Sequence, residues 1–180
     1  VSKKQKASDV ERVVNFLNRV LEEKNQVIRE IEDILSGSEF LDADGNRLFE
    51  DRFDYLNSSS VSAEEIYSEM LDIIFNADTD SSLTVVRLKN AEGEIGLRVG
   101  RGENYFGLVS IGDTKKFTDR VEENSEIAVE EQEFKKSLFD SIDSGDSDVN
   151  VLIGAKKFVE GWDSYRVSNM GLMRVGKSEG

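Results

Sequence analysis

A run of basic and small polar residues follows an apolar segment near the end of this 180-residue chain. Val151–Gly154 is typical of a short buried strand, and Lys156, Lys157, Gly161 and Asp163 follow it closely. In open α/β sheets, ligands bind outside the carboxyl ends of the strands. A buried strand alone does not require two lysines, a glycine and an aspartate at that place. The run is therefore the first candidate for a binding site.

A second pattern lies just beyond it. Gly171–Ser178 matches the Gly-x-x-x-x-Gly-Lys-Ser expression of a phosphate-binding loop. Such a loop needs a strand before its first glycine and a helix that opens at the Lys-Ser pair. Here Leu172–Val175 is itself typical of a strand, and only Glu179 and Gly180 follow. We therefore interpret the match as accidental, and a freestanding P-loop nucleotide-binding protein stays an alternative.

Three other polar clusters have structural interpretations. Asp42–Asn46 is similar to a calcium loop, but Phe53 stands where the bidentate glutamate belongs, so a polar turn is expected. Gly100–Gly107 has the wrong spacing for a dinucleotide fingerprint, and a strand follows it. The three glutamates in Glu130–Glu133 could act as paired acids, but we expect them at the start of a helix, where carboxylates suit the helix dipole. No catalytic residue and no metal ligand is predicted.

The composition narrows the chemistry further. The chain has no histidine and no cysteine, which excludes Ser-His-Asp and Cys-His arrangements, disulfides and thiolate metal sites. A net charge of −14 argues against DNA binding by the whole surface, although five basic residues stand against three acidic ones from Val151 onward. With 38% hydrophobic residues and no long apolar run, we expect a globular protein with no membrane contact. The absence of cysteine favours a reducing cytoplasm.

Two long helices are expected in the first half of the chain. The first opens with a capping box at Ser8–Glu11, runs to Gly37 at helical spacing and is interpreted as broken near Asn25. A second capping box at Ser62–Glu65 opens a helix that ends at about Asn76. We expect these helices to support the later strands, including the strand that leads into the candidate site.

The second half alternates strands with shorter helices. A helix is expected after Asp113 and another over Phe134–Ile142. The expected strands are Leu83–Lys89, Glu94–Val99, Phe106–Ile111, Ile127–Val129, Val149–Gly154 and Val167–Val175. The first two form a hairpin, and the later alternation favours a parallel sheet with right-handed crossovers.

The candidate run is similar to a known motif. An apolar strand followed by Gly-x-Asp, here Gly161–Asp163, resembles motif V of the superfamily 2 helicases. All of Val151–Gly180 more closely resembles the restriction subunit of type III restriction endonucleases, in which this block precedes the arginine-bearing motif VI. The stretches FEDRF, SAEEIY, KNAEGEIGLRVG and YFGLVSIGD also resemble that family. Two positions depart from helicase patterns, because Ala155 replaces a phosphate-contacting threonine and Glu160 an arginine.

The resemblance implies roles for four residues. Gly161 would allow close backbone approach to the nucleotide, and Asp163 would face its ribose or neighbouring arginines. Lys156 and Lys157 would meet the DNA backbone. The whole protein would use ATP and Mg²⁺ between two RecA-like domains to move on double-stranded DNA in the bacterial cytoplasm. It would cleave that DNA together with a modification methyltransferase subunit.

The resemblance also implies an architecture. We expect an α/β, RecA-like second motor domain that is incomplete, with a mostly parallel sheet and an inserted lobe. Residues 1–36 would be its first helix, 37–101 the lobe of a helix and an antiparallel hairpin, and 102–180 the remainder with motif V. The Walker motifs belong to the first motor domain, so the isolated chain is expected to be inactive. An acidic protein-interaction module is a further alternative.

Overall fold

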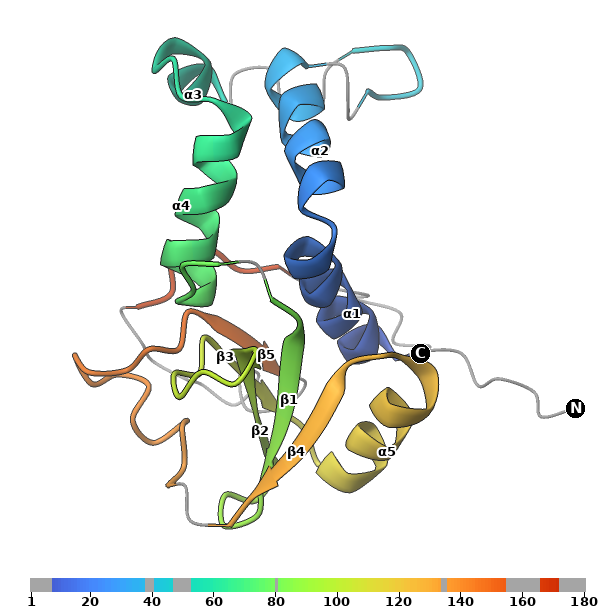
Figure 1. The fold of residues 1–180 in the computed structure, drawn as a ribbon, viewed down its shortest axis with the longest axis vertical. Helices are drawn as coiled ribbons and strands as arrows, with labels where there is room; N and C mark the ends of the chain where they lie inside the picture. The colour runs from blue at the N-terminus through green and yellow to red at the C-terminus, as the bar shows by residue number, and fades with distance from the viewer. Residues whose placement is uncertain are drawn as a thin grey trace, which may run out of the picture.

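The structure is a computed structural model, and it describes residues 8–37, 41–46, 53–79, 81–133, 136–154 and 166–171. In these ranges the chain forms an α/β fold with one mixed five-stranded sheet and five helices (Figure 1). The helices are α1 (Asp9–Glu22), α2 (Lys24–Ser36), α3 (Asp54–Ser58), α4 (Ala63–Phe75) and α5 (Thr114–Asn124). The strands are β1 (Leu83–Leu88), β2 (Glu94–Val99), β3 (Gly107–Ser110), β4 (Ala128–Gln132) and β5 (Val151–Gly154).

The first predicted helix is confirmed, together with its break. The Ser8 side chain accepts from the backbone of Glu11, whose carboxylate accepts from the Ser8 backbone, so both halves of the capping box are present. The break falls at Glu23 (φ −102°, ψ 44°), which separates α1 from α2. Gly37 ends α2 in the left-handed region at φ 71°, where glycine carries no steric penalty.

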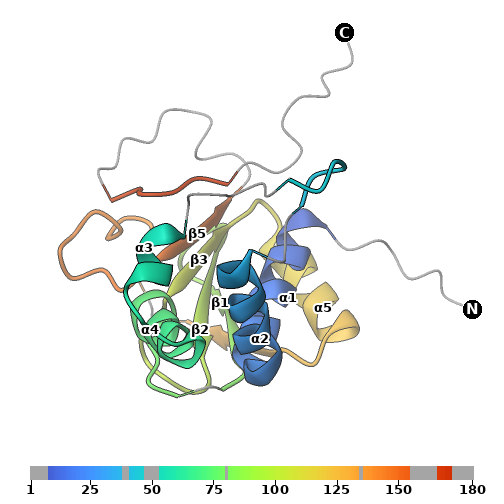
Figure 2. The ribbon, with the colours of Figure 1, turned by 90° about the horizontal axis from the view of Figure 1, so that it is seen from above.

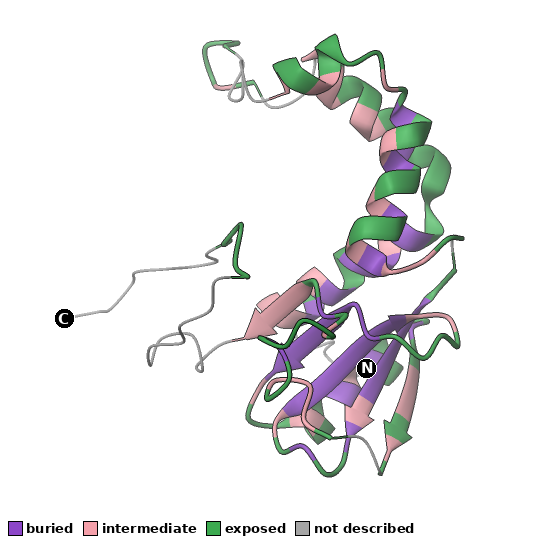
Figure 3. Cartoon of the chain, turned by 90° about the vertical axis from the view of Figure 1, so that its left-hand side faces the viewer, coloured by how far each residue is buried: buried purple, intermediate pink, exposed green. Residues whose placement is uncertain are grey.

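The second predicted helix, α4, packs against α2, and the pair stands out from one end of the sheet (Figures 1 and 3). We call α2, α3 and α4 the helical arm. The Ser62 capping box opens α4, and Asn76 ends it in the left-handed region at φ 51°. Tyr67 is buried in the arm, and its hydroxyl donates to the Val20 carbonyl of α1 at 3.1 Å. That hydrogen bond joins the base of the arm to the body of the molecule.

The sheet has the order β4-β1-β2-β3-β5 and is mixed, not mostly parallel as the sequence suggested. The β1–β2 hairpin is confirmed, and β3 continues it as a third antiparallel strand. The short connections between these strands leave room only for antiparallel neighbours. The longer crossover through α5 places β4 parallel to β1, and β5 lies parallel to β3.

The place of the hairpin differs from the expectation. We expected these two strands in a lobe set apart from the sheet, but β1 and β2 are central strands of it. The expected boundary near Arg101 falls between β2 and β3, which are hydrogen-bonded neighbours. The domain limits at residues 36 and 101 stay predictions.

Two layers cover the sheet. Helices α1 and α5 lie on one face, and residues 136–150 cross the other (Figure 2). Strand side chains alternate between them, with Val85 and Leu97 in the helix-side core and Val86 and Leu108 on the opposite side.

Gly96 lies beneath the ring of Tyr105 on the side opposite the helices. A Cβ atom added to Gly96 would stand 2.3 Å from Cδ1 of Tyr105. This position therefore needs glycine for close packing.

The helix expected over Phe134–Ile142, with the glutamates before it at its start, does not form in the described residues. The described part of Phe134–Ile142 forms turns instead of a helix, because the Glu94 carboxylate takes the backbone N–H groups of Leu138 and Phe139. The glutamates in Glu130–Glu133 lie on and just after β4 instead of opening a helix, since cross-strand ion pairs hold them.

The short helix after Asp113 and the strands over Phe106–Ile111, Ile127–Val129 and Val149–Gly154 are confirmed as α5, β3, β4 and β5, within a few residues at their ends. Residues 167–171 are not a strand, and 172–175 lie outside the described residues. Within the described ranges, no helix is both long and apolar enough to cross a membrane.

Candidate functional site

The four predicted site residues, Lys156, Lys157, Gly161 and Asp163, lie outside the described residues. The structure describes the strand that leads into them and the residues 166–171 that follow.

The strand β5 ends at the edge that the sequence argument favours. Its residues Val151–Gly154 pair in parallel with Gly107–Ser110, and Gly154 stands opposite Ser110. Because β2 is antiparallel to both β1 and β3, those two strands run the same way, as do β4 and β5. The carboxyl ends of four strands thus share one edge, which is the ligand-binding edge of open α/β sheets.

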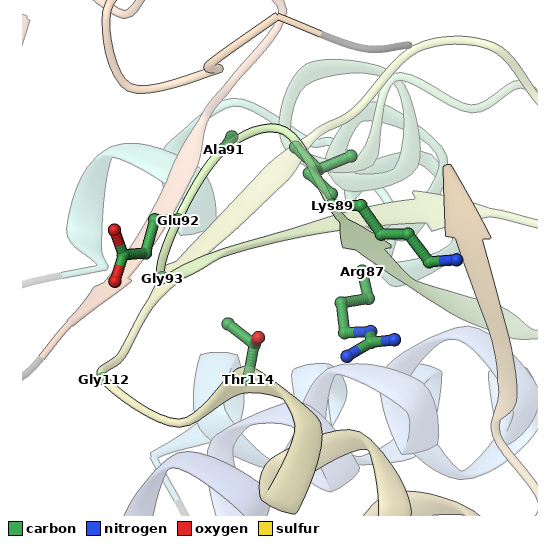
Figure 4. A pocket seen from close by; sticks show the side chains of 8 residues that line it. Arg87, Lys89, Ala91, Glu92, Gly93, Gly112 and Thr114 are labelled. Carbon is green, nitrogen blue, oxygen red and sulfur yellow. The ribbon is translucent and has the colours of Figure 1, made fainter. Parts of the chain in front are cut away.

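A pocket of about 360 Å³ opens at this edge (Figure 4). The β1–β2 connection forms one wall, and the link from β3 to α5 forms the other. Its lining residues are Arg87, Leu88, Lys89, Ala91, Glu92, Gly93, Gly112 and Thr114. Gly93 has a positive φ of 78°, and an added Cβ would stand 2.9 Å from the Ile111 carbonyl oxygen. The glycine keeps the two walls close together.

The cations of this pocket are held in ion pairs. Arg87 pairs with Glu131, and Lys89 Nζ lies 2.9 Å from Glu131 Oε2 and 3.0 Å from Glu133 Oε1. Hydrogen bonds from Lys89 and Arg87 lower the pKa of Glu131. Hydrogen bonds to Glu131 and Glu133 raise the pKa of Lys89. An anionic ligand entering the pocket would compete with these two glutamates for the cations.

The amino end of α5, beside Thr114, is also occupied. The Asp113 side chain accepts from the backbone N–H of Lys116 at 3.0 Å, which caps the helix and places a carboxylate at its positive end. Among the described residues, no group of three or more acidic, histidine or cysteine side chains could hold a metal ion. The charged groups Arg87 and Lys89 of the pocket are thus paired with the chain's own carboxylates.

Two charged side chains that the sequence argument missed hold the segment before β5. Glu94 is buried, and its carboxylate accepts from the Ser137 hydroxyl at 2.6 Å and from the Leu138 N–H at 2.8 Å. Arg166 donates to the carbonyls of Ile142, Ser147 and Val149, the last two at 3.1 and 3.4 Å. The alternation of β2 could have flagged Glu94, since it shares a face with Gly96, but nothing in the sequence singles out Arg166.

The discarded motifs keep their structural interpretations where they are described. Asp42 accepts from the backbone N–H groups of Asp44 and Asn46 and from the Asn46 side chain, which forms a closed polar turn. These hydrogen bonds, with that of the Asn46 side chain foremost, lower the pKa of Asp42. The glycines near Arg101 form a turn before β3. Of Gly171–Ser178, only Gly171 is described, and it is exposed.

Comparison with known proteins gives no relative: no protein-family model, curated protein or solved structure matches the chain. The fold class and the edge at which β5 ends are therefore the structural facts on which a function can be argued.

Proposed function

We propose that this chain is part of the second RecA-like motor domain of a type III restriction endonuclease subunit, an ATP-dependent translocase on double-stranded DNA. One observation carries the proposal. The run Val151–Gly180, which resembles the motif V block of that family, begins in β5, and β5 ends at the edge shared by four carboxyl strand ends. That edge is where motor proteins with open α/β sheets bind nucleotide and substrate.

In this proposal the residues after β5 act on two ligands. Lys156 and Lys157 contact DNA phosphates, while Gly161 and Asp163 face the nucleotide held between the two motor domains. ATP and Mg²⁺ bind in the whole subunit, where the first RecA-like domain supplies the phosphate-binding lysine and the magnesium ligand. The modification methyltransferase is the proposed partner. Phosphoryl transfer depends on these assembled parts, so the isolated chain has no ATPase activity in this proposal.

The mixed sheet is compatible with this assignment in one respect. Both strand pairs at its edges, β1 with β4 and β3 with β5, are parallel, so the antiparallel strand β2 does not disturb the common carboxyl edge. The helical arm stands at the end of the sheet opposite that edge (Figure 1).

The experiment that tests the proposal is recovery of the codons that follow Gly180 in the gene. A continuation of the form Gln-x-x-Gly-Arg-x-x-Arg would supply motif VI and support the motor. A stop codon directly after Gly180 would overturn it, and would favour a freestanding nucleotide-binding protein or an acidic interaction module.

A further inference from the structure

The base of the helical arm is joined to the start of β5 by two asparagine side chains. Asn150, the residue before β5, donates through Nδ2 to the carbonyls of Ile73 at 2.9 Å and Ile74 at 3.3 Å. The same amide donates to Asn76 Oδ1 at 2.9 Å. Asn76 in turn donates through Nδ2 to the Asp148 carbonyl at 2.7 Å. The last carbonyls of α4 are therefore satisfied by the segment that enters β5.

A ring contact reinforces the same junction. Phe75, the last residue of α4, packs against Phe106 with ring centroids 4.8 Å apart and planes tilted by 57°. The Phe106 carbonyl accepts from the backbone N–H groups of Asn150 and Val151 at 2.7 and 2.9 Å. The end of the arm thus contacts both the segment before β5 and the residue on which β5 begins to pair.

We propose that Asn76 and Asn150 form an amide latch that couples the helical arm to β5. A displacement of the arm then displaces the strand that leads into Lys156–Asp163. This last consequence rests on the proposed function, whereas the coupling itself does not. Asn150 acts as a positioning residue, since it holds the start of β5 against the end of α4.

The conformation of Asn76 makes the latch testable without straining the backbone. At φ 51°, Asn76→Gly keeps the left-handed turn and removes the side-chain amide, with both its donor Nδ2 and its acceptor Oδ1. Asn150→Ala removes the other half. Asn124→Ala is a matched control, because Asn124 donates to a carbonyl of α5 at 2.9 Å, and α5 packs on β1 and β4, at the edge of the sheet opposite β5.

A double-mutant cycle measured by urea unfolding of the 180-residue chain gives the coupling. Each latch variant should raise the unfolding constant roughly fivefold, about the net effect of the Asn150–Asn76 hydrogen bond that both variants remove. The double variant should raise it no more than about tenfold, because both changes break the same contact. Multiplicative effects, about twenty-five-fold for the double variant, would overturn the latch.

Hydrogen exchange separates coupling from simple helix capping. Tyr67→Phe loosens α4 from Val20 without removing the ring, and with the latch intact it should speed exchange in Val151–Gly154 more than in Leu83–Leu88. In the Asn150→Ala background, Tyr67→Phe should no longer speed exchange in Val151–Gly154 more than in Leu83–Leu88. In the Asn124→Ala background, this difference between the two strands should persist. Equal acceleration in both strands, or acceleration that survives Asn150→Ala, would overturn the proposal. Neither result depends on the codons that test the proposed function.

Discussion

Replacing Glu94 by alanine tests how the chain before β5 is held on the sheet. The carboxylate lies in the interior at 3% exposure and accepts from one hydroxyl and two backbone N–H groups of residues 137–139. Alanine would leave these donors without their acceptor. Because residues 136–150 cover one face of the sheet and lead into β5, their release would expose Leu108 and Ile142.

The magnitude follows from the three contacts. Hydrogen bonds to a charged group contribute about 1.5–3 kcal/mol each, but the weakest contact is 3.3 Å long and freed donors can recover water. We expect a loss of about 2–4 kcal/mol in the free energy of unfolding. Glu94→Gln keeps one acceptor oxygen and should lose about half as much.

Urea unfolding, followed by the circular dichroism of the backbone, measures this change in the free energy of unfolding. With a urea dependence of about 2 kcal/mol per molar, the midpoint should fall by about 1–2 M in Glu94→Ala. Glu92→Ala is the control, since Glu92 is exposed on the same turn and should change stability by less than about 0.5 kcal/mol. If the Glu94 and Glu92 variants unfold at the same midpoint, the carboxylate does not hold the segment and the reasoning is refuted.

Three further results are expected. Gly96→Ala should destabilise the fold by about 1–3 kcal/mol, and Tyr105→Ala in the same chain should relieve the clash; additive losses in urea unfolding would contradict this. The isolated chain should show no tight ATP binding in calorimetry, and micromolar affinity abolished by Lys177→Ala would revive the phosphate-loop alternative. DNA binding in a salt titration should be weak and strongly salt-dependent, and should fall further when Lys156 and Lys157 are changed to Glu; tight binding at physiological salt would contradict it.

Local sequence signals predicted α1, α2, α4 and α5. Both capping boxes opened helices, and Gly37 and Asn76 ended them, because these signals act through hydrogen bonds and dihedral angles of neighbouring residues. The β1–β2 hairpin was also predictable, since alternation of apolar residues is a local pattern.

Long-range pairing was not predictable in the same way. The glutamates of Glu130–Glu133 suit a helix start by local rules. Arg87 and Arg98 on other strands, and Lys89 just after β1, instead hold them in and beside β4. The helical spacing of Phe134–Ile142 was overridden by Glu94, which is distant in the sequence. Partners of this kind are set by tertiary structure, which local propensity does not encode.

In the candidate site, too, the local element was predictable and the long-range contacts were not. The sequence predicted the strand Val149–Gly154 and hence the edge where a ligand would bind, and β5 confirms the strand. The roles of Lys156, Lys157, Gly161 and Asp163 stay predictions. Arg166 was missed because it donates to backbone carbonyls, which have no sequence signature. Glu94 was missed because its partners, residues 137–139, are distant in the sequence.

The most direct test of the proposed motor uses Asp163→Ala in the complete subunit with its methyltransferase partner. Stability and ATP-dependent DNA cleavage should be measured on one preparation. The account predicts a loss of no more than about 1 kcal/mol in folding stability, the cost of a lost cap, together with collapse of cleavage. Near wild-type ATPase and cleavage activity would contradict it and would reduce Asp163 to a structural residue.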